Sequence, residues 1–519
     1  MSTPQPLGAA RPEPARAAPV TADVPRLDPR RVGTAAVLDL AATAPAGADS
    51  DTALARSRAV LGDLFGPVAD RQFAVRFWTG DEDAPPGGGA PPAFTLVLCH
   101  AGALRRMLLP PSELRLGEAF VRGDYDVVGD LEAATGLADV LRVRLSRPGM
   151  LVRITRRLLA LPAPVPASAP RGRLRGTERV APRHSRRRDR VAIQAHYDVG
   201  NDFYALWLDR RMVYSCAYFP TGRETLDAAQ AAKLELICRK LRLRPDDVLL
   251  DVGCGWGGLV QYAAEQFGVR AFGITLSEAQ AALVREQIAA AGLGERCQVA
   301  VLDYRDLDER VPFDKIVSVG MFEHVGPDRL GQYFGKVSRL LRPGGLFLNH
   351  GIVAAPGHPR AATPAALAAI TRRLVWRDGQ FIDRYVFPDG ELVAVAEAVA
   401  QAERCGLEAR DVESLREHYA ATLRHWGRRL ESARADAVRL VGEETYRVWR
   451  LYMAGSAHGF ASGRLGLAQV LFAKPHRDGS VDLPPTRADL YGPATPATIA
   501  RPGVYDRRGA PRPDRDCVA

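Results

Sequence analysis

The sequence predicts an α/β protein with a mostly parallel, doubly wound sheet, preceded by a smaller α+β domain. From about residue 191 to residue 475, strand-like apolar runs alternate with helical patterns, as in βαβ units. Within this region the run Leu249–Val252 is followed by glycines and then by a helical pattern, an order typical of a buried strand, a tight turn and a helix. Two later runs, at 271–277 and 316–320, end in small or polar residues, as the strand ends of such a sheet do.

The turn after the first strand contains Gly253, Gly255 and Gly257. Glycines allow a tight turn, and the free N–H groups of the next helix can approach a nucleotide-like ligand. The spacing favours S-adenosylmethionine over NAD, whose motif ends G-x-x-G and has an acidic ribose partner about 20 residues on. The next strand ends instead in Thr275 and Ser277. A dinucleotide site, or a plain strand-to-helix turn, is the alternative.

The length of 519 residues suggests two or three domains. No apolar run reaches the roughly 18 residues that cross a bilayer, and we expect neither a transmembrane helix nor a secretory signal. The seven cysteines are scattered without a C-x-x-C pair, which favours a reducing cytosol, and we expect no metal site.

Composition and pattern divide the chain further. In the small domain, residues 73–78 and 94–98 read as strands around a Pro/Gly loop, and residues 116–124 read as a short helix closed by glycine. The expected parts are a disordered segment (1–55), the α+β domain (56–140), a basic amphipathic helix and linker (141–190), the catalytic domain (191–475) and a flexible tail (476–519).

The net charge of +10 is concentrated in the segment 141–190, which holds fifteen arginines against two acidic residues. Within it Met150, Ile154 and Leu158 fall on one helical face. This pattern favours contact with an anionic membrane surface. Nucleic acid is a rival partner, but no recognition motif supports it, and a merely solvated linker is the third interpretation.

Four motifs lie around the glycine turn, namely HYDVGNDFY (196–204), MVYSCAYF (212–219), GMFEHVG (320–326) and FLNHGI (347–352). Together they resemble the cyclopropane fatty acid synthase family, which includes the mycolic acid cyclopropane synthases, over about residues 190–474. In the region 60–137, GEAF (117–120) followed by Gly123 and Asp124 is more loosely similar to the small N-terminal lipid-contacting domain of the bacterial enzymes. The resemblance implies a class I, Rossmann-like methyltransferase fold with a mostly parallel seven-stranded sheet.

The resemblance implies S-adenosylmethionine-dependent transfer of a methyl(ene) group to the cis double bond of unsaturated phospholipid acyl chains. A cyclopropane ring would form through a carbocation, with a bound bicarbonate as the base. By motif match its holders would be Cys216, Glu323, His350, the backbone of Ile352 and Tyr419. Each side chain also has a structural alternative: a buried thiol, a helix cap, a core histidine and a packed ring, respectively.

The same resemblance implies the cofactor site. We expect the glycines to line the methionine and ribose, and the polar residues after the second strand to face the ribose and adenine. The expected residues are Tyr214, Ser215, Asp251, Gly253, Cys254, Gly255, Trp256, Gly257, Thr275, Ser277, Gln280 and Tyr304.

One position departs from the family pattern, because Ser456 stands where the bacterial synthases usually carry cysteine. A serine cannot act as a thiolate, so the nature of the product stays open. A methyl- or methylene-branched acyl chain, methylation of a small-molecule amine and a non-enzymatic lipid-binding protein are the alternatives. We expect a cytoplasmic protein on the inner face of the membrane, and a homodimer remains open.

Overall fold

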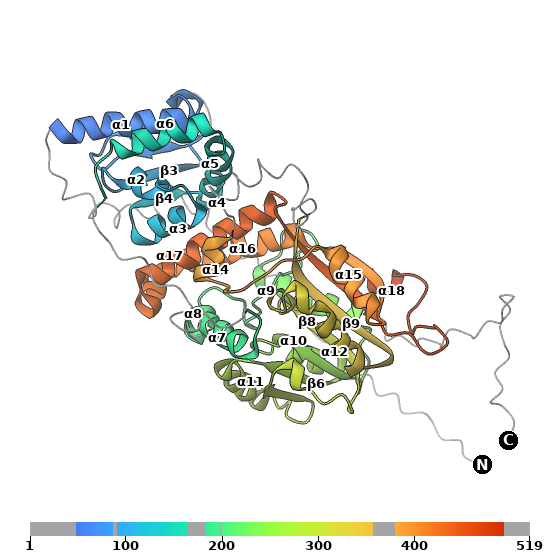
Figure 1. The fold of residues 1–519 in the computed structure, drawn as a ribbon. Helices are drawn as coiled ribbons and strands as arrows, with labels where there is room; N and C mark the ends of the chain where they lie inside the picture. The colour runs from blue at the N-terminus through green and yellow to red at the C-terminus, as the bar shows by residue number, and fades with distance from the viewer. Residues whose placement is uncertain (1–47, 87–90, 165–182, 198, 356–378, 492–519) are drawn as a thin grey trace, which may run out of the picture. The chain divides into compact units, whose positions relative to one another are not determined.

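The computed structural model describes residues 48–86, 91–164, 183–197, 199–355 and 379–491, which belong to one structural unit (Figure 1). The expected N-terminal segment lies almost wholly outside these ranges, as do much of the arginine-rich linker and of the tail. In the described part of the chain, no helix has the length and apolarity that crossing a membrane requires.

The larger sheet has seven strands in the order β10-β11-β9-β8-β5-β6-β7. The five strands from β9 to β7 are parallel to their neighbours, whereas β11 is antiparallel to both β9 and β10. This topology confirms the predicted fold class. The strands are β5 (Val248–Val252), β6 (Arg270–Thr275), β7 (Cys297–Val301), β8 (Phe313–Val319), β9 (Leu341–Ala354), β10 (Glu408–Ser414) and β11 (Leu465–Ala473).

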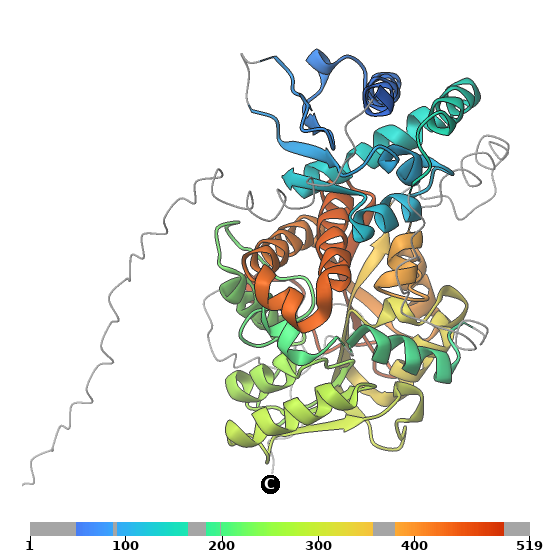
Figure 2. The same ribbon diagram turned by 90° about the vertical axis from the view of Figure 1, so that its left-hand side faces the viewer.

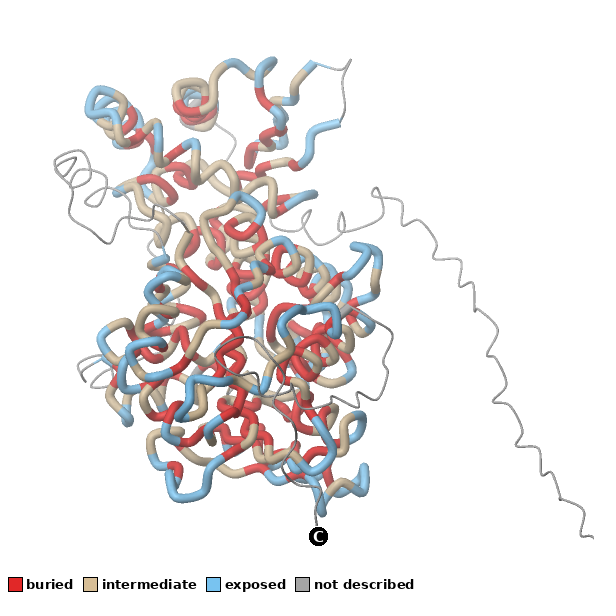
Figure 3. The backbone as a smooth tube through the Cα atoms, turned by 90° about the vertical axis from the view of Figure 1, so that its right-hand side faces the viewer, coloured by how far each residue is buried: buried red, intermediate tan, exposed pale blue. Residues whose placement is uncertain are grey.

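Helices cover both faces of this sheet because neighbouring strand residues point to opposite sides. Leu249 packs with α9, α10 and α11, while Leu250 packs with α12 and α15. Figure 3 shows buried backbone through the interior and exposed loops outside it. The helices are α7 (Arg186–Tyr197), α8 (Asn201–Ala205), α9 (Leu226–Lys240), α10 (Gly258–Phe267), α11 (Glu278–Ala290), α12 (Leu330–Leu340), α14 (Gln380–Tyr385), α15 (Val395–Arg404), α16 (Arg416–Ser432), α17 (Arg434–Ala461) and α18 (Ala488–Tyr491).

The smaller sheet has four strands in the order β2-β1-β3-β4. Both predicted strands appear in it, as β1 and β3, and the predicted short helix appears as α3. This helix ends at Gly123, whose φ of +79° closes it with a left-handed cap. The elements are α1 (Ala48–Phe65), β1 (Ala74–Arg76), β2 (Glu82–Asp83), β3 (Phe94–Leu98), α2 (Ala103–Leu108), α3 (Glu113–Arg122), β4 (Tyr125–Gly129), α4 (Leu131–Thr135), α5 (Leu137–Leu145) and α6 (Pro148–Leu159).

Helix α6 is the expected amphipathic helix, but its apolar face is not free. Ile154 and Leu158 are each 1% exposed and pack in the same core as Leu61 of α1 and Leu141 of α5. The small domain therefore extends through α6, and the expected boundary at residue 140 falls inside α5.

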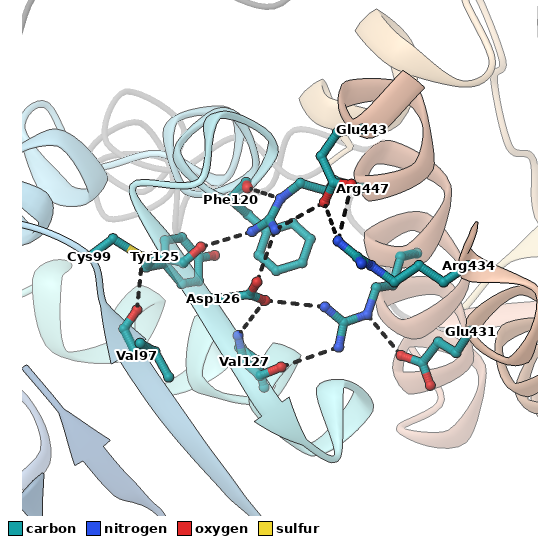
Figure 4. A network of polar contacts seen from close by, with 11 residues as sticks. Val97, Cys99, Phe120, Tyr125, Asp126, Val127, Glu431, Arg434, Glu443 and Arg447 are labelled. Carbon is teal, nitrogen blue, oxygen red and sulfur yellow. Dashed lines mark hydrogen bonds and ion pairs between the residues drawn. The ribbon is translucent and has the colours of Figure 1, made fainter. Parts of the chain in front are cut away.

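A buried arginine joins the small domain to α17, which lies beside α16 (Figures 1 and 2). Arg447 donates from Nε to the Phe120 carbonyl (2.7 Å) and from Nη2 to the Tyr125 carbonyl (3.0 Å). Its Nη1 pairs with Asp126 (2.9 Å), and its guanidinium lies 4.4 Å from the Phe120 ring centroid (Figure 4). Because these groups come from the last turns of α3 and the first residues of β4, they anchor that edge of the small domain to α17.

Candidate active site

The first cavity opens at the carboxyl ends of β5, β6 and β8, where β5 lies between the other two strands. Ligands of doubly wound sheets bind at such a topological switch point. Ten of the twelve residues expected at the cofactor line this cavity: Tyr214, Ser215, Asp251, Gly253, Cys254, Gly255, Trp256, Thr275, Gln280 and Tyr304.

Two of the expected cofactor residues, Gly257 and Ser277, do not line the cavity. Gly257 begins α10 with a φ of +74°, and a Cβ there would lie 2.6 Å from Val284 Cγ1. Ser277 caps α11, accepting a hydrogen bond from the Gln280 backbone N–H (3.3 Å). Both residues therefore place neighbouring groups, and Ser277 sets the start of the helix that carries Gln280.

Gly253 is the glycine that the turn itself requires. Its φ is +87°, and a Cβ at this position would lie 3.1 Å from Met321 Cβ. Trp256, which lies three residues later and also lines the cavity, is 2% exposed. Its Nε1 donates a hydrogen bond to Asn201 Oδ1 (2.9 Å), which connects α8 to the turn. The turn thus presents backbone to the cavity, as binding of a nucleotide-like cofactor requires.

A buried lysine under this cavity was not expected from the sequence. Lys233 of α9 is 2% exposed, lines the cavity and donates from Nζ to Ser215 Oγ (2.9 Å). Burial lowers the pKa of Lys233 to about 8, and burial raises the pKa of Asp251 to about 7, opposed by the lysine charge. Only tertiary packing brings these groups together, because α9 precedes β5 and nothing in its sequence marks Lys233.

The second cavity is larger, about 1020 Å³, and most of its wall is apolar. Residues of the small domain and of α17 contribute to it together with the ends of β8 and β9. All six residues expected at the reacting centre line it: Cys216, Glu323, His350, Ile352, Tyr419 and Ser456.

The two cavities share part of their walls. Five residues line both of them, namely Tyr197, Tyr214, Ser215, Gly320 and His324. We call these five residues the seam. A group bound in the first cavity and a substrate in the second can meet only where the walls are common, so the seam locates the reaction.

Glu323 and His350 form the polar wall of the second cavity next to the seam. Glu323 Oε1 accepts from the backbone N–H of Ile352 (2.7 Å), so this N–H, expected to hold a small ligand, orients Glu323 instead. Gln469 Nε2 lies 3.1 Å from His350 Nδ1. Among the described residues, Glu323 Oε2 and His350 Nε2 are buried without a hydrogen-bond partner, so both atoms are open to a ligand.

Burial sets the protonation of this wall. The pKa of Glu323 is raised to about 7, chiefly by desolvation, and burial holds the pKa of His350 well below its usual value. Burial also raises the pKa of the Cys216 thiol and of the Tyr419 hydroxyl. Near pH 7 the His350 imidazole is therefore neutral, the Cys216 thiol is protonated, and the Glu323 carboxyl group is about half ionised.

Aromatic rings surround the seam. The Tyr214 hydroxyl lies 3.4 Å from that of Tyr452, and the Tyr452 ring centroid lies 5.8 Å from that of Phe387. Tyr197 packs edge-on against Tyr214, with ring centroids 6.4 Å apart. Such ring faces attract positive charge where water is excluded.

The seven-stranded sheet and its glycine-turn cavity define a class I S-adenosylmethionine-dependent methyltransferase. The profile of the mycolic acid cyclopropane synthetase family matches residues 184–470, more than half of the chain. The chain therefore belongs to this family and is an S-adenosylmethionine-dependent methyltransferase.

Among similar proteins is a probable fatty acid methyltransferase of Pseudomonas putida, 43% identical over 418 residues, which are 80% of this chain and 95% of that protein. A probable fatty acid methyltransferase of Mycobacterium tuberculosis is 40% identical over 389 residues, 72% of this chain and 86% of that protein. The structure of the cyclopropane synthase MmaA2 from M. tuberculosis is 33% identical and matches with a TM-score of 0.50, covering 55% of this chain and 98% of that one.

The mycolic acid cyclopropane synthase CmaA1, in complex with SAH and CTAB, matches with a TM-score of 0.50 and 35% identity. The match covers 55% of this chain and 97% of the CmaA1 chain. The solved synthases thus match little more than half of the chain, whereas the P. putida relative matches four fifths of it.

Proposed function

We propose that the enzyme methylates the carbon–carbon double bond of an unsaturated acyl chain in a phospholipid, with a cyclopropane ring as the product. The observation that carries this proposal is the second cavity, which is large, apolar and joined to the cofactor cavity at the seam. A soluble amine would need neither such a wall nor the small domain that contributes to it. The relatives named as fatty acid methyltransferases support the same substrate class.

The cofactor, when bound, supplies an electrophilic methyl group. Methylation of one alkene carbon leaves positive charge on the other, and this charge must be stabilised without being trapped. The rings of Tyr214, Phe387 and Tyr452 line the cavity and offer their faces to the charge. The Cys216 thiol stays protonated because burial raises its pKa, so it is a poor nucleophile there.

Loss of a proton from the added methyl group closes the ring. Glu323 Oε2 is a candidate for directing this proton, since it lines the second cavity and its pKa of about 7 makes it ionisable at the working pH. Glu323 Oε2 and His350 Nε2, both buried and without partners among the described residues, also fit a small oxyanion. They would hold a bicarbonate ion, which would supply the proton acceptor.

The second candidate product is a methyl- or methylene-branched chain, formed when the proton leaves from another carbon. Ser456 lines the cavity where the bacterial synthases usually carry cysteine, so the wall around the cation differs at this position. The names of the relatives include both fatty acid methyltransferases and cyclopropane synthases.

We also propose that the enzyme works at the surface of an anionic membrane. The inward face of α6 is buried, so membrane contact would use its outer face. There Val152 and Leu159 are 59% and 55% exposed, beside the exposed Arg153 and Arg156. Apolar side chains interleaved with arginines suit the interface of anionic lipid. Co-sedimentation with phosphatidylglycerol vesicles, but not with phosphatidylcholine vesicles, is the expected result.

The test of the main proposal uses the purified full chain, S-adenosylmethionine labelled in its methyl group, and vesicles of oleoyl phosphatidylglycerol. We expect label in the acyl chains, and gas chromatography of the methyl esters before and after hydrogenation separates ring from branch. Cofactor binding without labelled lipid, together with label in an added amine, would overturn the proposal.

Glu323→Gln tests the proton-handling wall. We expect kcat to fall by about 10² to 10⁴, the range for a lost general base, with S-adenosylhomocysteine binding unchanged. Glu295→Gln, at an exposed turn, is the matched control and should leave kcat as it was. Unchanged turnover in Glu323→Gln would remove this carboxylate from the mechanism.

A further inference from the structure

Apart from the seam, the wall of the second cavity contains a group of positively charged side chains. Asp139 and Arg142 of α5 line it there, together with Arg464, which follows α17. Arg464 Nη1 lies 2.6 Å from Asp139 Oδ1, His458 Nε2 lies 2.8 Å from Asp139 Oδ2, and Arg142 Nη2 lies 3.5 Å from Asp139 Oδ1. We call Asp139, Arg142, His458 and Arg464 the arginine cluster. The formal charges of these four residues sum to one positive charge even when His458 is neutral.

The cluster is partly open to solvent, as expected at the mouth of a cavity. The side chains of Arg142 and Arg464 are 32% and 35% exposed, and that of Asp139 is 31% exposed. Besides pairing with Asp139, guanidinium groups at the mouth of an otherwise apolar cavity suit an occupant with an anionic end. Guanidinium groups also match the geometry of phosphate and carboxylate oxygens.

Helix α17 relates the cluster to the seam. One face of this helix lines the cavity at Tyr452, Gly455, Ser456 and Gly459. Tyr452 contacts Tyr214 at the seam, while the helix ends at Ala461, beside the cluster. The rise of about 1.5 Å per residue places His458 about 9 Å, and the end of the helix about 14 Å, from Tyr452 along the axis.

This span matches half of a fatty acyl chain. An extended chain advances about 1.2 Å per covalent bond, so about eight to twelve bonds cover the distance. A chain whose head end lies at the cluster would therefore place a mid-chain double bond near the seam. The wall between the two points is open at Gly455, where an added Cβ would meet no atom within 4 Å.

We propose that Arg142 and Arg464 bind the anionic head end of the acyl substrate while its chain runs along α17 to the seam. This inference rests on the proposed function and adds to it a head-group site and a measure of where along the chain the methyl group is added. Phosphate of a phospholipid and carboxylate of a free fatty acid share the required chemistry.

The experiment compares three oleoyl substrates in the same neutral detergent micelles, namely phosphatidylglycerol, oleate and methyl oleate. For Arg142→Gln and Arg464→Gln we expect KM to rise about ten- to a hundred-fold for the anionic substrate that is the true ligand, as loss of a charged hydrogen bond implies. The kcat, and the rate with methyl oleate, should stay within about two-fold of the parent enzyme. Arg464→Lys should bind the substrate more tightly than Arg464→Gln but less tightly than the parent enzyme, because it keeps the positive charge and loses the paired N–H donors of the guanidinium group.

The outcomes separate the possible causes. A rise in KM with phosphatidylglycerol alone identifies the phosphate, and a rise with oleate alone identifies the carboxylate. An equal loss with all three substrates, or no loss with either anion, overturns the head-group site. A parent enzyme that labels none of these lipids would instead contradict the proposed function.

Gly455→Phe tests the path along α17 independently. The ring would project into open cavity, so we expect loss of activity with all three lipids and unchanged binding of S-adenosylhomocysteine. Full activity in this variant would overturn the path. Gly427→Phe on α16, where a Cβ is 4.0 Å from its nearest neighbour and which does not line the cavity, is the matched control.

Discussion

The two cavities are built in different ways. Every residue that lines the cofactor cavity comes from one stretch between Asp189 and Val325, mostly from strand ends and the turns that follow them. The second cavity, which we propose holds the substrate, is lined by residues as distant in sequence as Leu61 and Leu467, from both domains. The first cavity is thus a property of local βα units, whereas the second exists only when the domains are held together.

The largest expected effect comes from breaking that junction. Arg447→Met removes the guanidinium that joins α17 to Phe120, Tyr125 and Asp126. It leaves the two backbone carbonyl groups without this donor, while Asp126 keeps its pair with Arg450. A buried acceptor left without a partner costs about 1–3 kcal/mol, so the free energy of unfolding should fall by about 2–6 kcal/mol. Thermal unfolding measures this loss, and KM for the lipid should rise.

Binding of S-adenosylhomocysteine below the melting temperature should change little in Arg447→Met, because its cavity lies within one domain. The matched control is Arg439→Met in α17, whose side chain is 68% exposed and, within the described ranges, pairs with Asp436 alone. If Arg447→Met weakened cofactor binding as much as lipid use, the two cavities would not be independent.

The opposite test disrupts the first cavity alone, by Gly253→Val in the glycine turn that follows β5. A φ of +87° is strained for any residue with a Cβ, and the side chain would press on Met321. A strain of about 1–3 kcal/mol corresponds to roughly ten- to a hundred-fold weaker cofactor binding, measured by calorimetry. Gly292→Val has similar backbone strain (φ +67°) in an exposed turn and should leave the affinity unchanged.

Two buried lysines offer a finer comparison. Lys233→Met should weaken cofactor binding about ten-fold, because Ser215 loses its donor and Asp251 loses the nearby charge. Lys315 is also buried, with its pKa likewise lowered to about 8, but it lines neither cavity. Lys315→Met should therefore leave cofactor affinity alone, and equal losses in both variants would make Lys233 a merely structural residue.

The last comparison concerns the dependence of kcat on pH. In the proposed mechanism the Glu323 carboxylate directs the proton to the acceptor only when it is ionised, so kcat at saturating cofactor should rise with pH up to its pKa of about 7 and then level off. The slope below pH 7 should approach ten-fold per unit and should be absent in Glu323→Gln. Because Asp251 titrates in the same range, cofactor affinity is measured separately at each pH. A slope that persists in Glu323→Gln would belong to another group.

Sequence patterns were sufficient for the elements that local rules govern. The strand, turn and helix around Gly253 form a contiguous motif, and ten of the twelve cofactor residues inferred from resemblance line one cavity. The expected ligand contacts were less accurate for residues whose role is to position a neighbouring group. Gly257 and Ser277 start helices, and the Ile352 N–H is engaged by Glu323. Such roles depend on which atom is nearest in space.

The pattern of α6 predicted a helix correctly, but it could not tell what its apolar face packs against. Ile154 and Leu158 form an apolar face that suits a membrane or a protein core equally well, and the structure places it in the core of the small domain. Periodicity reports that one face of a helix is apolar, and says nothing about what covers that face.

The sequence by itself determined the doubly wound sheet, the glycine turn and the cofactor class, because these depend on contiguous residues and short-range backbone geometry. The tertiary structure alone decided which side chains share a wall. It placed Lys233 under Ser215, joined Arg447 to the small domain and set Arg142 beside Arg464 in one cavity. The physical reason is that burial and the pairing of charges arise from packing between segments far apart in the chain, which no local pattern records.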